Sequence, residues 1–194
     1  NLLKKEFQEN YIFINFDFEV ENKMVIGLGD DSVHETSITL HHIYGVPYIP
    51  GQAIKGVFRN FIIKNEYEAK EENALKEEVF RKLFGDSQNQ GKVIFFDAYP
   101  QSNFKIKKDI MTPHYQNYYN EKNEVPTDDM DPNPIPFLVV EDTTFEVALA
   151  IKKDIDICNE EKIRNEIEKT FDYTGIGAKV SLGYGFINIK KGDD

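Results

Sequence analysis

The segment Tyr11–Val20, YIFINFDFEV, places the strongest limit on the folds open to this chain. Ile12, Ile14, Phe16 and Phe18 alternate with mostly polar residues, so they lie on one face of an extended strand. A strand with one apolar face is stable only in a sheet whose matching face is covered by other elements. The sequence therefore predicts a sheet with one packed face, beginning near the N-terminus.

Helices and further strands are predicted from apolar periodicity and from the glycines and prolines between the periodic segments. Helices are predicted over residues 52–65, 71–84 and 159–171. Strands are predicted over residues 37–43, 92–99, 137–140, 144–151 and 183–189. The strands 137–140 and 144–151 are expected to pair as a hairpin, and Gly85 is placed as the C-cap of the second helix.

The order of these elements predicts an α+β fold. It is close to the split β-α-β-β-α-β pattern, with insertions. That pattern is typical of a ferredoxin-like (RRM-like) antiparallel sheet with helices on one face, which leaves the other face free for a ligand. No break in composition demands a second domain. We therefore expect residues 1–194 to form a single domain, with an irregular insertion at about residues 101–134.

Charge is unevenly distributed along the chain. The formal net charge is −11, which taken alone argues against a free-standing nucleic-acid binder, because such proteins usually have a basic surface. Yet residues 36–65 and 173–192 contain no acid, and residues 98–120 contain Asp109 as their one acid. Buried strands and tight turns also have little room for carboxylates, so these segments indicate a binding surface without establishing one.

The composition is typical of a soluble globular protein. No apolar run reaches the roughly 18 residues of a membrane span, and the first ten residues are too polar for a secretory signal. Cys158 is the single cysteine, which excludes an internal disulfide framework. These features predict a cytoplasmic protein without membrane contacts.

A glycine-rich segment, GIGAKVSLGYG, precedes the last predicted strand. Its glycines are Gly175, Gly177, Gly183 and Gly185. Glycine permits positive φ and close backbone approach, and the amide groups of such a loop can cradle a phosphate. Lys179 and Ser181 would add a positive charge and a hydroxyl. The spacing is neither that of a P-loop nor that of a dinucleotide fingerprint, so a plain glycine-rich turn remains the alternative.

A second candidate lies in HHIYGVPYIPGQAIKGVFRNFI, which opens the first predicted helix. Gly51 precedes the helix N-terminus, whose free N–H groups and dipole favour anions. Lys55 and Arg59 are four residues apart and share one helix face, which would suit consecutive phosphates. An ordinary solvated helix face remains the alternative.

Catalytic and metal-binding patterns are weak in this sequence. The histidines are His34, His41, His42 and His114. They lack metal-ligand spacing and a partnering cysteine pair, so we expect neither a metal nor a cofactor. Asp109 and His114 form a possible acid–base pair. Pro113 restrains the residue before it, so a helix is not expected to present both groups on one face.

Several segments together resemble the RAMP superfamily of CRISPR proteins. The similarity is carried by YIPGQAIKGVFRNFI, GKVIFFDAYP, DIMTPHYQNYY, NPIPFLVV and GIGAKVSLGYGFINI. It spans about residues 40–189, and it includes a likeness to subunits of type III-B CRISPR effector complexes. The combination is specific, whereas the glycine-rich segment alone is not.

This resemblance implies a non-catalytic, RNA-binding backbone subunit. Such a subunit assembles on a guide RNA toward its 3′ end, together with target RNA and other RAMP subunits. Target cutting in the superfamily resembles the work of a different, repeated subunit. RNA contacts are then expected from Lys55, Arg59, Gly175, Gly177, Lys179, Ser181, His114 and Tyr115.

Two other functions remain open from the sequence. One is a metal-dependent RAMP endoribonuclease that uses Asp109 and His114. The other is a pure protein scaffold, in which neighbouring subunits make all contacts with RNA.

Overall fold

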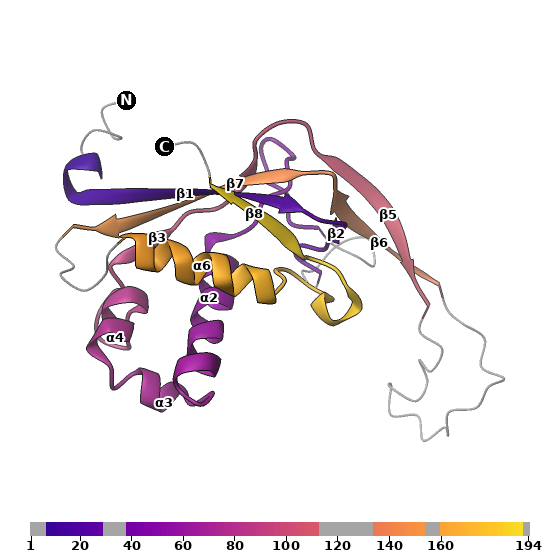
Figure 1. Cartoon of the computed structure of the whole chain (residues 1–194). Helices are drawn as coiled ribbons and strands as arrows, with labels where there is room; N and C mark the ends of the chain where they lie inside the picture. Colours follow the sequence, from indigo (N-terminus) through magenta and orange to yellow (C-terminus); the bar gives the residue numbers. More distant parts are fainter. Residues whose placement is uncertain (1–6, 29–37, 113–133, 154–159, 192–194) are drawn as a thin grey trace, which may run out of the picture.

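The computed structural model describes residues 7–28, 38–112, 134–153 and 160–191 (Figure 1). The strands of its larger sheet are β1 (Tyr11–Val20), β3 (Val93–Phe95), β4 (Tyr99–Pro100), β7 (Thr144–Lys152) and β8 (Ile187–Lys191). The strands of its smaller sheet are β2 (Lys23–Met24), β5 (Lys105–Met111) and β6 (Ile135–Glu141). All pairings are antiparallel, in the orders β3-β7-β1-β8, with β4 also on β7, and β2-β6-β5. The chain is therefore an α+β protein, as the sequence predicts.

The apolar alternation of β1 builds the core of the larger sheet. Ile14, Phe16 and Phe18 are fully buried and lie opposite equally buried residues of β7. The helices α2 (Gly51–Glu66) and α6 (Glu160–Tyr173) contribute to the same core and lie on one side of the sheet in Figure 1. The sheet with one packed face that β1 predicts is confirmed.

Both covering helices present apolar stripes at helical spacing. The stripe of α2 includes Ile54, Phe58 and Phe61, and that of α6 includes Ile163 and Ile167. The first and third predicted helices are thus confirmed as far as the described residues extend. Among those residues, no helix is long and apolar enough to cross a membrane.

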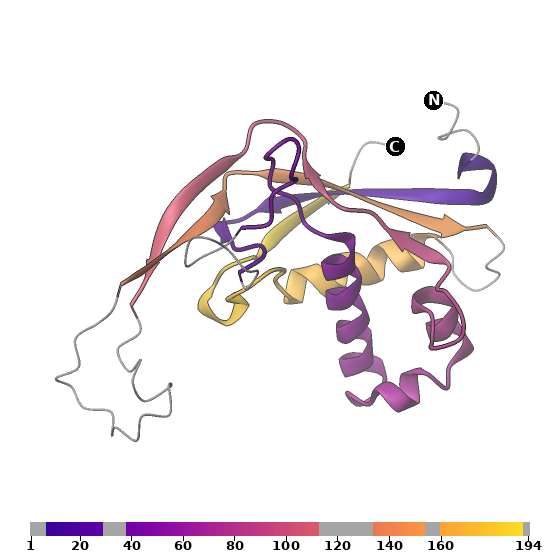
Figure 2. The ribbon, with the colours of Figure 1, turned by 180° about the vertical axis from the view of Figure 1, so that it is seen from behind.

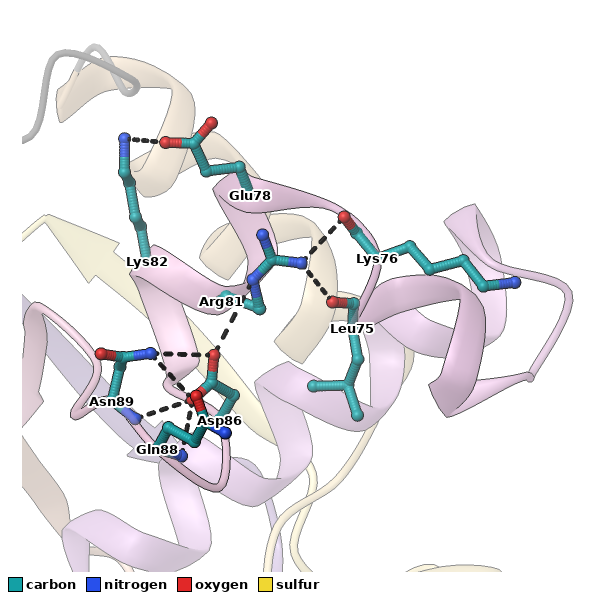
Figure 3. Close-up of polar contacts among 8 residues, drawn as sticks. All are labelled: Leu75, Lys76, Glu78, Arg81, Lys82, Asp86, Gln88 and Asn89. Carbon is teal, nitrogen blue, oxygen red and sulfur yellow. Dashed lines mark hydrogen bonds and ion pairs between the residues drawn. The ribbon is translucent and has the colours of Figure 1, made fainter.

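The second predicted helix, residues 71–84, is two helices in the structure. They are α3 (Glu71–Ala74) and α4 (Glu78–Phe84). The guanidinium of Arg81 donates to the carbonyl oxygens of Leu75 (2.5 Å) and Lys76 (2.9 Å), so both carbonyls at the break are bound (Figure 3). Gly85 ends α4 as predicted, with a φ of +87° that glycine adopts without strain.

The predicted hairpin of residues 137–140 and 144–151 is wrong. β6 pairs with β5 and β2 in the smaller sheet, whereas β7 pairs with β1, β3 and β4 in the larger one. The chain turns sharply between them, with Asp142 at a φ of +45°. Thr143 is buried there, and its hydroxyl donates to the carbonyl oxygen of Glu141 (2.7 Å). This turn passes the chain from one sheet to the other.

The strand predicted over residues 92–99 is interrupted. β3 and β4 both pair with β7, but the chain leaves the ladder between them. Ala98 instead exchanges two backbone hydrogen bonds with Ile49, of 2.8 and 2.9 Å. The segment that leads into α2 is thereby tied to the sheet.

Three further predictions on irregular segments need correction. The strand predicted over residues 37–43 is reduced, where it is described, to one bridge between Leu40 and Pro47. The insertion at 101–134, expected to be irregular, contains the regular strand β5. The strand predicted over residues 183–189 begins later, as β8.

β5 and β6 form a long hairpin that extends away from the larger sheet and from the helices (Figures 1 and 2). A small apolar cluster lies along this hairpin, where Val25, Phe137 and Val139 are buried. Met111 and Tyr184 pack against this cluster. Tyr184 belongs to the glycine-rich segment, so that segment and the hairpin share one core.

Candidate nucleic-acid interface

The cations of α2 are bound within the fold. The Lys55 ammonium donates to the carbonyl oxygen of Phe84, at the end of α4 (2.8 Å). Arg59 pairs with Glu71 of α3 (2.6 Å), and its guanidinium lies 5.1 Å from the ring centre of Phe80. The two cations share a helix face, as predicted, but that face packs against α3 and α4.

The N-terminus of α2 already has an anionic partner. The Gly51 N–H donates to the carboxylate of Asp97 (2.8 Å). A carboxylate here is favourable because the helix dipole places positive charge at this end, and it weakens attraction for a second anion. A Cβ on residue 51 would lie 2.2 Å from the carbonyl oxygen of Phe95, so Gly51 is needed for close packing.

Two glycines of the glycine-rich segment are also required by packing. A Cβ on Gly177 would lie 2.3 Å from the carbonyl oxygen of Val25, which accepts a hydrogen bond from the Ala178 N–H (2.8 Å). A Cβ on Gly185 would lie 2.0 Å from the carbonyl oxygen of Ile176. Both glycines have positive φ, of +98° and +74°. Close approach of the backbone to itself therefore explains them without a ligand.

The tip of this segment, residues 181–183, is open to solvent. Lys179 has a left-handed backbone conformation, with φ +60° and ψ +29°, and it leads into a short 3₁₀ turn. Ser181 and Leu182 are exposed, and a Cβ on Gly183 would meet no atom within 4 Å. This part of the segment is free to contact another molecule.

The Lys179 side chain lies against the β5–β6 hairpin. Its ammonium is 2.7 Å from the sulfur of Met111 and 5.2 Å from the ring centre of Phe137. Within the described residues it has no carboxylate partner, in contrast to Lys105, Lys107 and other cations nearby that form ion pairs. Among the described residues, Lys179 therefore brings a positive charge without an acidic partner to the junction of the glycine-rich segment and the hairpin, which we call the loop–hairpin junction.

Asp109, the acid of this junction, is held by three donors. The Lys23 ammonium and the Tyr184 hydroxyl each lie 2.9 Å from one carboxylate oxygen, and the Ile110 N–H donates to the other (2.9 Å). The hydrogen bond from Lys23, more than any other contact, lowers the pKa of Asp109 below its ordinary value. Burial and the bond to Asp109 raise the pKa of Tyr184. Asp109 is therefore a structural anion, fully charged near neutral pH.

The structure separates the predicted site residues into two groups. Gly175, Gly177, Lys179 and Ser181 belong to the segment that follows α6, which contacts the hairpin through Lys179 and Tyr184. Lys55 and Arg59 contact α4 and α3 instead, and Figure 1 shows these two helices on the other side of α2 from the hairpin. His114 and Tyr115 lie outside the described residues, shortly after the end of β5. Met111, the last residue of β5, contacts Lys179, so the sequence continues from the loop–hairpin junction toward those two residues.

The comparisons with known proteins are consistent with this architecture. The model of the RAMP superfamily matches residues 17–188. The CRISPR system Cmr subunit Cmr6 of Pyrococcus furiosus is 34% identical in an alignment 247 positions long, gaps included, which covers 95% of this chain and 72% of that protein. The chain belongs to the RAMP superfamily, and within it to the Cmr6 family. A second Cmr6 relative, from Saccharolobus solfataricus, is 27% identical over 190 residues.

Solved structures agree with this family assignment. The crystal structure of Cmr6 from Pyrococcus furiosus matches 94% of this RAMP chain with a TM-score of 0.56 and 31% identity. A chain in the cryo-EM structure of the type III-B Cmr-beta complex bound to cognate target RNA matches with a TM-score of 0.78 and 24% identity, over 98% of this chain and 62% of that one. This RAMP chain also spans 59% of the Saccharolobus solfataricus Cmr6 protein.

Sequence reasoning missed two residues of the loop–hairpin junction. Lys23 and Tyr184 both bind Asp109, across 86 and 75 residues of sequence. The position of Tyr184 between two glycines is the one local signal that could have indicated its contact, because a bulky residue there needs a packing partner. Elsewhere in the described part of the chain, no group of three or more His, Cys, Asp or Glu residues is arranged to hold a metal ion.

Proposed function

We propose that this chain is a non-catalytic backbone subunit of a type III-B CRISPR effector complex in antiviral defence, and that it binds guide RNA near its 3′ end. The Cmr6 relatives and the similarity to a chain of a target-RNA-bound Cmr-beta structure support a place beside target RNA and other RAMP subunits. The observation that carries RNA binding is the Lys179 charge at the loop–hairpin junction, which has no acidic partner among the described residues.

The loop–hairpin junction has the chemistry of a phosphate contact. Lys179 supplies a cation, while exposed Ser181 supplies a hydroxyl and solvent-facing backbone lies beside it. Contacts of this kind position RNA without reading its sequence, as a subunit that accepts many guides requires. For His114 and Tyr115, which follow β5 in the sequence, we propose RNA contacts from their chemistry alone, because an aromatic ring and an imidazole suit an unpaired base.

Lys55 and Arg59 are secondary parts of the proposal. Both are half-buried. The Lys55 ammonium donates to the Phe84 carbonyl oxygen, and the Arg59 guanidinium pairs with the Glu71 carboxylate. An RNA phosphate would have to compete with these intramolecular partners. We therefore assign them a stabilising role first, with any RNA contact weaker than that of Lys179.

We also propose that the chain has no catalytic role. A general base acts best with a pKa near the working pH, whereas Lys23 and Tyr184 hold the pKa of Asp109 low. Asp109→Asn should leave single-turnover cleavage of saturating target RNA by equal amounts of assembled complex within about twofold of normal. A loss of a hundredfold or more would support the endoribonuclease alternative.

A scaffolding contribution is favoured by acids on the face of the larger sheet that lies opposite to the helices. Asp17 and Glu19 of β1 and Glu146 of β7 lie on the face opposite to the buried phenylalanines. Glu19 pairs with Lys190 (2.8 Å), so Asp17 and Glu146 carry the negative charge that remains, and that charge suits a basic protein partner. This face supports contacts with neighbouring subunits in addition to RNA binding at the junction.

We also propose a ferredoxin-like topology, a single domain and a cytoplasmic location for this chain. The strand order β3-β7-β1-β8, with α2 and α6 on one face, supports a ferredoxin-like split β-α-β unit. One family match over residues 17–188 supports a single domain across residues 1–194. A cytoplasmic location is proposed with the effector role.

The test is guide occupancy in purified complexes. Complexes reconstituted with Lys179→Ala should retain several-fold less guide RNA after a high-salt wash than wild-type complexes. Lys64→Ala is the matched control, because it removes an exposed lysine in the last turn of α2, away from the loop–hairpin junction. Equal retention in the two variants would remove the loop–hairpin junction from the RNA surface.

A further inference from the structure

A closed loop leads from β2 toward α2 and carries exposed rings at its tip. Leu40 and Pro47 form a bridge at its base, and the Gly45 N–H donates to the carbonyl oxygen of His41 (2.7 Å). Gly45 has a φ of +64°, which closes the turn. Tyr44 is nevertheless 74% exposed, so its position is fixed by the loop and by ring contacts rather than by burial.

Five rings join at this loop into what we call the aromatic group: His41, His42, Tyr44, Tyr48 and Tyr99. The His41 ring stacks on His42 with centroids 5.2 Å apart and planes 11° apart, and on Tyr44 at 4.9 Å and 29°. Tyr48 stacks on Tyr99 at 5.6 Å and 23°, and His41 lies 6.0 Å from Tyr99. Stacked rings are thereby held in place at the protein surface.

The aromatic group lies away from the loop–hairpin junction. In Figure 2 its loop projects beside the connection between β4 and β5, on the side of the larger sheet away from α2 and α6. The segment that supplies four of its rings contains no acid from residue 36 to residue 65. Carboxylates of that segment therefore do not repel an RNA strand, and the acid that the sheet pairing places beside the group is Glu146, opposite Tyr99.

We propose that the aromatic group is a stacking site for an unpaired RNA base. A base presents a flat π face with polar edges, and tyrosine and histidine rings match both features. Two of these rings are imidazoles and their segment contains no acid, which favours a polyanion as the ligand, and Ile43 is the one strongly exposed aliphatic residue at the tip. Stacking tolerates any base, as a guide-binding subunit requires. The inference rests on the proposed RNA-binding function and adds a second site to it.

The test uses complexes reconstituted with the full chain and with guide RNAs that carry 4-thiouridine at successive positions. Irradiation should crosslink one guide position to peptides that contain residues 41–48 or Tyr99. Tyr44→Ala should reduce that crosslink roughly fivefold or more, and Tyr44→Phe should preserve it, because stacking needs the ring and not the hydroxyl. Tyr173→Ala is the matched control, since Tyr173 is 75% exposed and lies on α6.

A second measurement separates stacking from phosphate contact. An abasic nucleotide at the crosslinked position should weaken binding to wild-type complex by roughly fivefold and leave the Tyr44→Ala complex almost unchanged. Equal losses in both complexes would overturn the inference.

The remaining outcomes are also decisive. Crosslinks elsewhere in the chain, without any at the aromatic group, would leave the proposed RNA binding intact and overturn the stacking site. An absence of crosslinks to the whole chain would overturn both. Loss of subunit assembly in Tyr44→Ala, with crosslinking unchanged in the complexes that form, would identify the loop as a protein contact instead.

Discussion

The two basic regions of this molecule look alike in sequence and differ in structure. Residues 36–65, which contain Lys55 and Arg59 of α2, and the glycine-rich segment of the loop–hairpin junction both lack acids. In the α2 region, Lys55 and Arg59 meet Phe84 and Glu71, which belong to a later segment. At the junction, Lys23 and Tyr184 already bind the carboxylate of Asp109. Lys179 contacts the sulfur of Met111 and the ring of Phe137. Whether a cation is available to RNA therefore depends on contacts between distant segments.

The largest expected effect tests whether the glycines serve the fold or a ligand. Gly177→Val should lower the free energy of unfolding by about 2–4 kcal/mol, because a Cβ 2.3 Å from the Val25 carbonyl oxygen and a φ of +98° both add strain. Urea denaturation measures the change. Gly183→Ala is the control, because residue 183 has a similar φ of +91° and open space around it, so its loss should be clearly smaller.

A result in which Gly177→Val unfolds at the same urea concentration as wild type, yet loads little guide RNA, would contradict this assignment. The glycine would then be needed for a ligand, and the contrast between packed glycines and an exposed tip would fail.

The next effect concerns the α2 region. Replacing Lys55 and Arg59 together by alanine should cost about 1–2 kcal/mol of unfolding free energy, through loss of a hydrogen bond, an ion pair and the contact with Phe80. Guide loading by the folded fraction should change less than it does in Lys179→Ala. Glu71→Gln should reproduce part of the stability loss.

If the double variant keeps wild-type stability and loses guide RNA, the two cations belong to the RNA surface. The difference between the two regions would then be the reverse of the one inferred here.

A smaller effect is the pH dependence of the junction. Because the pKa of Asp109 is lowered in the folded state, its contacts stabilise the fold above the ordinary value of 3.8, and this contribution is lost as the pH falls through the lowered pKa. Asp109→Asn should therefore cost about 1 kcal/mol at pH 7 and progressively less toward pH 3. Urea denaturation of both proteins across this range measures it. A loss that is independent of pH would show that the charge of Asp109 is not what binds Lys23 and Tyr184.

Local periodicity was enough to predict β1, α2 and α6, because each buries one face that recurs at a fixed spacing. It failed at the turn between β6 and β7. Two adjacent apolar strands usually pair, and only the positive φ of Asp142 and the buried Thr143 direct them into separate sheets. The sequence likewise does not predict the short break between α3 and α4 that Arg81 stabilises, because the apolar pattern continues across it.

The candidate site was predictable only in part, for a related reason. The absence of acids from its segment predicts Lys179 as an RNA contact, and the structure leaves it without an acidic partner among the described residues. The same pattern predicts Lys55 and Arg59, but Glu71 and the end of α4 reach them from outside the segment. The aromatic group combines residues 41–48 with Tyr99 across about fifty positions, which no local pattern indicates.

The most direct test of the account is the salt dependence of guide-RNA binding by reconstituted complexes. Lys179→Ala should lower the magnitude of the slope of log K against log salt by about 0.7, the change expected for one lost phosphate contact on a single strand, while Lys64→Ala leaves it unchanged. An unchanged slope in Lys179→Ala, with a lowered slope when Lys55 and Arg59 are replaced, would contradict the assignment of RNA binding to the loop–hairpin junction.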